Sequence, residues 1–151
     1  MTPLFKKLHY KGQSPICILN APADLAPLWD AMAPFATLVP GLPPEGPVTY
    51  ALAFATTLAD VERLTAQLAP RLEGDATLWF CYPKASSKRY RCAFNRDTGW
   101  AALGAAGFEP VSQVALDDDW SALRFRRVAY IAMMTRGFAM TEEGKQKAGL
   151  G

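Results

Sequence analysis

Residues 16–22 read Ile-Cys-Ile-Leu-Asn-Ala-Pro, and this stretch decides the fold. Its first four residues are apolar and rich in β-branched side chains, which is typical of a strand buried on both faces of a sheet. Asn20-Ala21-Pro22 ends the strand. The apolar side chains that follow fall on one stripe of a helix: Leu25, Leu28, Trp29 and Met32. A buried strand followed by an amphipathic helix is the repeating unit of a parallel α/β sheet.

The same alternation occurs twice more along the chain. Residues 48–54 and 76–82 are apolar runs that predict buried strands, and a helical segment follows each of them. Thr57 and Asp60 resemble a capping box that opens the first of these two helices. Two further strands, 111–116 and 122–128, flank the turn formed by Asp117-Asp118-Asp119. The sequence therefore predicts a three-layer, Rossmann-like α/β fold, with a mostly parallel sheet and a C-terminal antiparallel hairpin.

One domain accounts for this pattern. We expect it to span residues 1–140, with residues 141–151 as a flexible tail because they are polar and contain glycine. The proline- and glycine-rich segment 40–47 predicts a stiff surface connection. Thr37-Leu38-Val39, just before it, is interpreted as a short edge strand.

Composition and charge indicate an ordinary globular protein. The chain has 151 residues, of which 50% are hydrophobic, and a formal net charge of +2, so no global field favours nucleic acid or a membrane. The N-terminal segment lacks the apolar core of a signal peptide, and no apolar run approaches the ~18 residues of a membrane helix. The three cysteines, Cys17, Cys81 and Cys92, are interpreted as reduced thiols of a cytoplasmic protein.

Two short segments carry a resemblance to a known fold family. Lys11-Gly12-Gln13 precedes the first strand, and Gly107-Phe108 precedes the hairpin. The layout resembles a shortened, diverged Rossmann methyltransferase in which the proline-rich connection replaces the middle strands. In a doubly wound sheet of this kind, ligands bind outside the carboxyl ends of the strands.

Four segments carry a second resemblance, to a family of small bacterial proteins of unknown function. It spans roughly residues 11–128 and rests on residues 18–22, Tyr82-Pro83-Lys84, Asn95-Arg96-Asp97 and the specific run Asp119-Trp120-Ser121-Ala122-Leu123-Arg124-Phe125. Because that family has no assigned activity, the resemblance implies the fold and nothing about function.

The exit of the first strand argues against a cofactor bound in the usual way. Dinucleotides and S-adenosylmethionine need close backbone approach, which glycine permits, and Asn20-Ala21-Pro22 contains no glycine. We therefore expect no cofactor. Asn20 is either a ligand-binding side chain at this rim or the N-cap of the following helix.

The loop that follows the third strand is the main candidate site. Its side chains could hold a phosphate or single-stranded nucleic acid through charge and hydroxyl donors: Lys84, Ser86, Ser87, Lys88, Arg89 and Arg91. The partner would be an anionic small molecule or a nucleic acid. The alternative is a solvated loop whose charges serve solubility.

The sequence offers little support for a metal site or a catalytic site. Asp117-Asp118-Asp119 could hold a hard cation, but adjacent aspartates are typical of turns, and Asp119 could instead pair with Arg124, Arg126 or Arg127. His9 is the one histidine, so no zinc site or catalytic triad can be assembled around it. We expect no metal site and no catalytic residues.

Two hypotheses on function remain. The first is a non-catalytic binding or regulatory domain that lacks a glycine-rich cofactor loop. The second is a divergent methyltransferase, or a nucleotide- or nucleic-acid-binding protein that uses loop 84–91. An apolar stretch after the last strand could form a homodimer contact or an amphipathic helix packed on the sheet: Tyr130, Met133, Met134, Phe138 and Met140.

Overall fold

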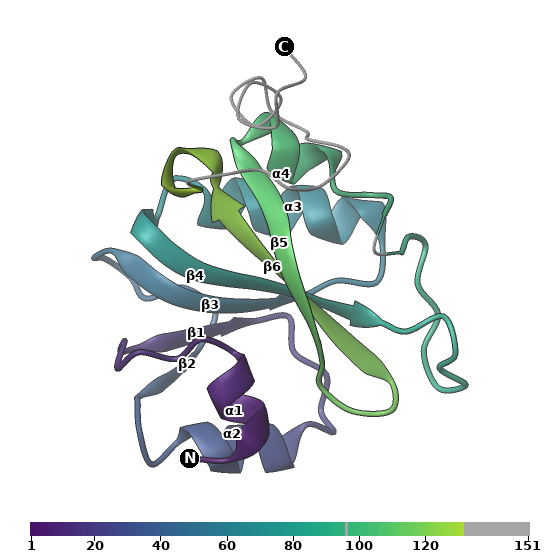
Figure 1. The fold of residues 1–151 in the computed structure, drawn as a ribbon, viewed down its shortest axis with the longest axis horizontal. Coiled ribbons are helices and arrows are strands. Elements are labelled where there is room, and N and C mark those ends of the chain that lie inside the picture. Colours follow the sequence, from purple (N-terminus) through teal and green to yellow (C-terminus); the bar gives the residue numbers. More distant parts are fainter. Residues whose placement is uncertain (96, 132–151) are drawn as a thin grey trace.

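A six-stranded sheet with helices on both faces forms the molecule, as the computed structural model shows for residues 1–95 and 97–131 (Figure 1). The strands are β1 (Ile16–Leu19), β2 (Leu38–Pro40), β3 (Val48–Phe54), β4 (Leu72–Pro83), β5 (Phe108–Ala115) and β6 (Trp120–Arg127). The helices are α1 (Pro3–Lys7), α2 (Ala26–Met32), α3 (Leu58–Leu68) and α4 (Ala101–Ala105), and a 3₁₀ turn, η1 (Val128–Tyr130), follows β6.

The strand order β2-β1-β3-β4-β6-β5 confirms the predicted fold class. The pairs β1–β2, β1–β3 and β3–β4 are parallel, whereas β6 is antiparallel to both β4 and β5. The short edge strand expected at residues 37–39 is β2, and the parallel strands expected from the three apolar runs are β1, β3 and β4.

The starts of β4, β5 and β6 differ from the prediction, and β6 begins at Trp120 rather than at residue 122. β5 begins at Phe108 rather than at residue 111, because Pro110 lies beside a register irregularity that accommodates it within the strand. β4 begins at Leu72 rather than at residue 76. Residues 73–75, near the start of β4, are exposed and include two acidic side chains, so their sequence does not predict a buried strand.

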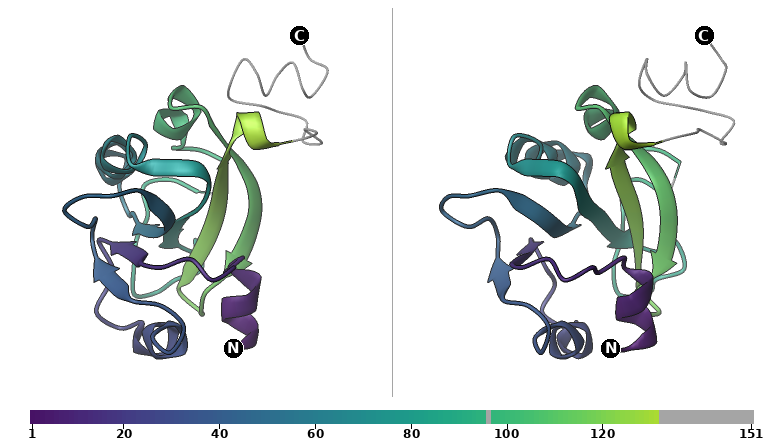
Figure 2. Two further views of the ribbon diagram at one scale, coloured as in Figure 1. Left: turned by 90° about the vertical axis from the view of Figure 1, so that its left-hand side faces the viewer. Right: turned by 60° about the vertical axis from the view of Figure 1, so that its left-hand side comes forward.

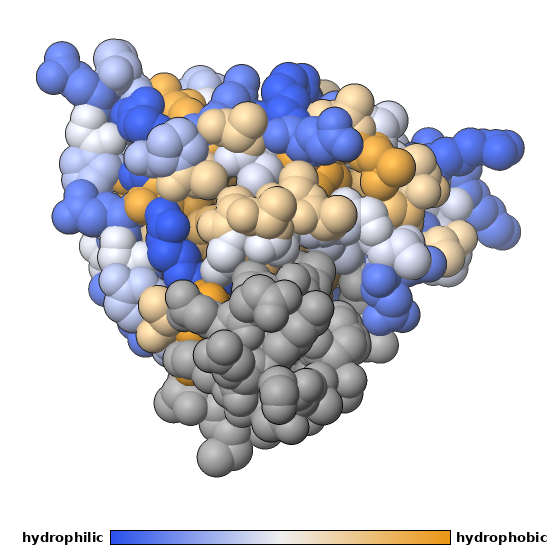
Figure 3. Space-filling model, turned by 90° about the horizontal axis from the view of Figure 1, so that it is seen from above, coloured by the Kyte–Doolittle hydropathy of each residue, from blue (hydrophilic) through white to orange (hydrophobic). Residues whose placement is uncertain are grey.

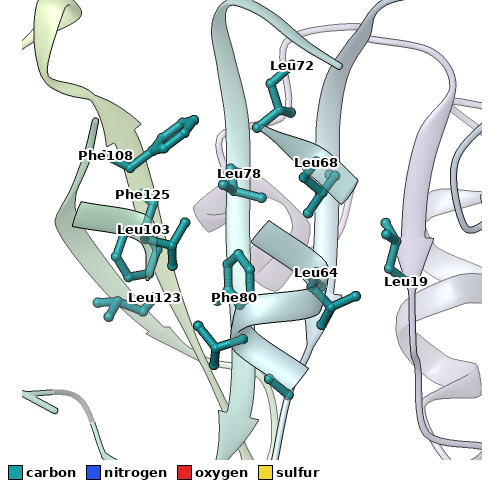
Figure 4. Close-up of a cluster of buried hydrophobic side chains, with 14 of the residues drawn as sticks. Leu19, Leu64, Leu68, Leu72, Leu78, Phe80, Leu103, Phe108, Leu123 and Phe125 are labelled. Atoms are coloured by element: carbon teal, nitrogen blue, oxygen red, sulfur yellow. The ribbon is translucent and has the colours of Figure 1, made fainter. Parts of the chain in front are cut away.

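One apolar core lies between the sheet and the helices α3 and α4 (Figure 4). Leu64 and Leu68 of α3 and Leu103 of α4 pack on Leu78 and Phe80 of β4. Thr57 caps α3 by accepting a hydrogen bond from the Asp60 backbone N–H (3.1 Å). This cap fixes where α3 begins, and therefore which of its faces meets the sheet.

A second core lies on the opposite face, under α1 and α2. Phe5 and Leu8 from the N-terminal segment pack with Leu28 and Met32 of α2 against Trp79 of β4. α1 had no sequence prediction. It begins at Pro3 after the Thr2 cap, a position where the missing N–H of proline costs no helical hydrogen bond.

The segment between α1 and β1 runs across this second face of the sheet, from the β5–β6 side to β1 (Figure 2). The Leu8 carbonyl accepts two buried hydrogen bonds, from Tyr50 Oη (2.6 Å) and Trp79 Nε1 (3.0 Å). Farther along, Gln13 Nε2 donates to Thr77 Oγ1 (3.3 Å). His9 adopts a positive φ of 58°, which turns the chain over the sheet.

The cysteines and the chain end complete the comparison with the sequence. Cys17 and Cys81 are buried free thiols, and Cys92 is partly buried. Among the described residues, no helix is long and apolar enough to cross a membrane. The expected tail 141–151 and the four apolar residues between 133 and 140 lie outside the described residues.

Candidate functional site

The carboxyl ends of β1 and β3 meet where the chain turns to opposite sides of the sheet, which is the place where ligands bind in folds of this class. Asn20 lies there with a φ of 60°, and its side-chain Nδ2 donates to the Phe54 carbonyl at the end of β3 (2.8 Å). Asn20 therefore links the two strand ends. Its interpretation as an N-cap is wrong, since α2 begins after Leu25.

A cavity of about 810 Å³ opens beside Asn20, and we call it the β1–β2 cavity. The ends of β1 and β2 contribute to its lining, together with Arg63, Leu64 and Gln67 of α3. Its polar or aromatic lining residues are Asn20, Trp29, Arg63 and Gln67.

The residues of the β1–β2 cavity do not fit S-adenosylmethionine, the cofactor that the methyltransferase-like layout implies. A sulfonium and an ammonium group call for carboxylates, but none of the lining residues is acidic, and Arg63 contributes a positive charge. The Asn20 amide is already engaged with Phe54, and residues 20–22 contain no glycine for close backbone approach.

A second cavity, of about 840 Å³, lies at the end of β4, and we call it the basic cavity. The loop that follows β4 forms most of its wall. At the right of Figure 3, where this loop lies, hydrophilic side chains project from the molecule. Its charged and hydroxyl-bearing lining residues are Tyr82, Lys84, Ser87, Lys88, Arg89, Tyr90, Arg91 and Thr98.

Two aspartates from other parts of the chain hold the loop in place. Ser87 Oγ donates to Asp119 Oδ1 (2.8 Å) and accepts from the Tyr90 backbone N–H (3.1 Å). Arg89 forms ion pairs with Asp24 and with Asp119 (3.6 Å to the latter). Tyr90 Oη donates to Asp24 Oδ1 (2.9 Å). The loop after β4 is therefore tied to the loop after β1 and to the hairpin turn.

These contacts determine which cations remain free. The hydrogen bond from Tyr90 and the nearby Arg89 guanidinium lower the pKa of Asp24, and Asp24 in turn raises the pKa of Arg89. The charge of Arg89 is thus already balanced by Asp24 and Asp119. Lys84, Lys88 and Arg91 form no ion pair with any residue that the structure describes.

Aromatic side chains form the inner wall of the basic cavity. Tyr82 and Phe94 lie with ring centroids 5.9 Å apart, and Phe94 meets Trp100 edge-on at 4.8 Å. Gly99, with a φ of 92°, lets this wall close, because a Cβ there would lie 2.5 Å from Phe94 Cβ. A flat, partly apolar ring is the kind of group that such a wall accommodates.

The structure groups most of the predicted site residues. Lys84, Ser87, Lys88, Arg89 and Arg91 line the basic cavity. Asn20 lines the separate β1–β2 cavity, and Ser86 lines neither of the two.

Several contributors to the two cavities were missed by sequence reasoning. Trp29 and Arg63 are spaced as ordinary helix residues, and no local signal links Asp24 to a loop 65 residues later.

The aspartate-rich turn is confirmed as a turn. Asp117 Oδ1 accepts from the backbone N–H groups of Asp119 (2.8 Å) and Trp120 (2.7 Å). The expected pairing of Asp119 with an arginine of the second hairpin strand is wrong: Asp119 pairs with Arg89, and Arg126 pairs with Asp75. Within residues 1–95 and 97–131, no three potential metal ligands cluster.

Comparison with known proteins yields a fold and no family. No family model and no curated protein matches the chain. Among solved structures, the pyocyanin biosynthetic protein PhzM superimposes with a TM-score of 0.53 and 14% identity, over 81% of this chain and 52% of PhzM. The chain thus spans about half of PhzM, and the likeness shows a shared Rossmann-like fold.

Two further structures superimpose more weakly. The N-methyltransferase NodS from Bradyrhizobium japonicum WM9 gives a TM-score of 0.47 at 12% identity, over 74% of this chain and 72% of NodS. The fibrillarin pre-rRNA processing protein of Methanococcus jannaschii gives 0.46 at 16% identity, over 74% and 55%.

Proposed function

We propose that this protein binds a mononucleotide in the basic cavity, with the phosphate on Lys84, Lys88 and Arg91 and the base against the aromatic wall. The observation that carries the proposal is the presence of three cations without ion-pair partners among the described residues, around one cavity of about 840 Å³. A cavity of this size accommodates a nucleotide-sized ligand.

The geometry of the loop supports an assigned role for each group. Lys84 directly follows β4, so the sheet fixes its backbone, and its N–H donates to the Asp119 carbonyl (2.7 Å). Arg89 and Ser87 hold the loop rather than the ligand, since both are bonded to Asp119. Tyr82 and Phe94, both largely buried, line the cavity beside the cations.

A divergent methyltransferase is the second candidate. NodS, one of the weaker structural matches, is an N-methyltransferase by name, and the likeness to PhzM supports the fold that this candidate needs. The residues at the β1 exit oppose it, because they do not fit the methyl donor. We therefore prefer a binding protein to a methyltransferase, and one titration series separates the two.

Isothermal titration calorimetry tests both candidates. AMP, ATP and a short single-stranded oligonucleotide are each titrated into the protein at low and high salt, and S-adenosylmethionine and its demethylated product are titrated in parallel. We expect the nucleotides to bind and their affinity to fall with salt, because screening weakens exposed charge pairs. Binding of S-adenosylmethionine in place of nucleotides would favour the methyltransferase, and binding of a single-stranded oligonucleotide alone would replace the mononucleotide.

A matched pair of variants locates the site. Lys88→Ala with Arg91→Ala removes two exposed cations from the cavity, whereas Lys6→Ala with Lys7→Ala removes two exposed cations elsewhere and changes the net charge equally. The first pair should weaken AMP binding about tenfold or more, and the second should leave it unchanged. Equal affinities for the two pairs would contradict the assignment.

Cys92 gives a second, independent readout because it lines the same cavity. Bound nucleotide should slow alkylation of Cys92 in proportion to occupancy. If AMP binds but Cys92 reacts at its original rate, the ligand lies elsewhere.

A further inference from the structure

The sheet face beneath the N-terminal segment holds a cationic cluster that the proposed nucleotide site does not use. Arg124 and Arg126 of β6 point to the same face, since side chains alternate along a strand. This is the face of Trp79, which pairs in register with Arg124 and whose ring lies 6.1 Å from that of His9.

Arg124 is half-buried and lacks an acceptor. Its Nε is buried without a hydrogen-bond partner, and Arg124 forms no ion pair with a residue that the structure describes. Arg126 differs, because it forms a bidentate pair with Asp75 (2.7 and 2.9 Å). Desolvation lowers the pKa of Arg124, and the neighbouring Arg126 lowers it further. A buried donor left unpaired on a cation is costly unless an anion satisfies it.

Ser112 adds a second unsatisfied group at the same place. Ser112 of β5 pairs in register with Arg124, so the two side chains lie side by side on one sheet face. Its Oγ is also buried without a partner. Two neighbouring polar groups, one of them charged, therefore lack partners within the part of the chain that the structure describes.

The N-terminal segment brings further positive charge over this face. The two hydrogen bonds to the Leu8 carbonyl and the bond from Gln13 to Thr77 fix the segment on either side of His9 and Lys11. Burial lowers the pKa of His9, and the charges of Arg124, Lys11 and Arg126 lower it further. Two acidic residues lie beside them: Asp75, already paired with Arg126, and the buried Glu109 of β5, which is in register with Arg126.

We infer that Arg124, Ser112 and Lys11 form a second anion site, which takes a doubly charged oxyanion such as the phosphoryl group of a small phosphate monoester. The anion accepts hydrogen bonds from the part of the Arg124 guanidinium that is not buried, Ser112 lies beside Arg124, and Lys11 contributes charge from the segment above. This site is independent of the basic cavity, because the two share no lining residue.

The sole histidine of the chain makes the test direct. Inorganic phosphate is titrated into the full chain while the imidazole resonance of His9 is followed by NMR. We expect a saturable shift and a higher His9 pKa with phosphate bound, because the anion offsets the charges of Arg124, Lys11 and Arg126. An equal concentration of sodium chloride controls for ionic strength.

Three variants decide whether Arg124 holds the anion. Arg124→Met keeps the length of the side chain and should weaken phosphate binding about tenfold. Lys11 is exposed, so Lys11→Ala leaves the packing intact and should weaken phosphate binding several-fold. Arg63→Met on α3 removes one charge elsewhere and should leave the phosphate affinity unchanged.

Two results would overturn the site. The first is a phosphate response of His9 no larger than that of chloride. The second is an unchanged phosphate affinity in the folded Lys11→Ala and Arg124→Met variants. Loss of phosphate binding in Lys88→Ala with Arg91→Ala, rather than in these variants, would assign the anion to the basic cavity instead.

Discussion

Asn20 is the residue at which this chain departs most clearly from a ligand-binding turn of its fold class. It occupies a left-handed backbone position at the end of β1, where glycine would permit close approach of a ligand. Its side chain is instead bonded to the Phe54 carbonyl and connects two strand ends. Folds of this class commonly bind a ligand at this position, but in this protein the side chain there stabilises the ends of two strands.

Substitution of Asn20 separates its two contributions. Asn20→Gly keeps the backbone conformation and loses the hydrogen bond, so we expect a loss of about 1 kcal/mol. Asn20→Ala loses the bond and adds the penalty of a left-handed alanine, so its loss should exceed that of the glycine variant by roughly 1 kcal/mol. Urea denaturation measures both, and equal losses would show that the backbone is relaxed at this position.

Gly99 provides a steric prediction. In Gly99→Ala the new Cβ meets Phe94 Cβ at 2.5 Å and Cγ at 2.9 Å, so the aromatic wall must shift. We expect a loss of about 1–3 kcal/mol beyond the backbone penalty. Gly41→Ala is the matched control, since Gly41 also has a positive φ (106°) but has nothing within 4 Å of its Cβ position. Thermal denaturation should therefore separate the two variants clearly.

At the scale of the element, the start of α3 is the part of the structure that the sequence predicted in most detail. Thr57 and Asp60 have the spacing of a capping box, and the structure confirms the bond from the Asp60 N–H to Thr57 Oγ1. The returning bond comes from the Thr56 N–H to Asp60 Oδ2 (3.1 Å), one residue earlier than expected. A sequence can predict a helix cap of this kind because the groups that form it lie within four residues of one another.

The cap of α3 makes stability depend on pH. Burial opposes ionisation of Asp60, but hydrogen bonds from Thr56 and Thr57 outweigh it, and together with Arg63 they lower its pKa. A lowered pKa in the folded state stabilises the protein above the unfolded value of about 3.9 and loses that contribution as the pH falls through the folded value. The stability difference between wild type and Asp60→Asn should therefore be largest near pH 7 and shrink towards pH 2. A constant difference across that range would contradict this assignment.

The connections between elements were less accessible to the sequence than the elements themselves. The buried runs at 16–19 and 48–54 became strands with the expected bounds, because burial on both faces leaves an unmistakable apolar pattern. The partners of the basic loop could not be predicted in the same way. Asp24 and Asp119 lie far from it in sequence, and the sequence around a turn aspartate does not indicate which cation it will pair with.

For the whole molecule, the two buried cysteines, Cys17 and Cys81, report global unfolding. Burial raises the pKa of the Cys17 and Cys81 thiols, and both are fully enclosed. Cys92 is partly buried at the rim of a cavity. A thiol reagent should therefore modify Cys92 first, and modify Cys17 and Cys81 together only as fast as the whole protein opens. Mass spectrometry of the time course checks this order, and early reaction of Cys81 alone would reveal local opening of the sheet.

The two hydrogen bonds to the Leu8 carbonyl have a consequence for synthesis. Residues 1–10 leave the ribosome before the partners of Leu8, which lie 42 and 71 residues later, on β3 and β4. Until β4 has emerged, Phe5 and Leu8 have no core to enter, and the nascent chain carries them as exposed apolar groups. This segment is thus made before the strands that bury it, and a chaperone that acts during translation would meet its exposed apolar side chains in that interval.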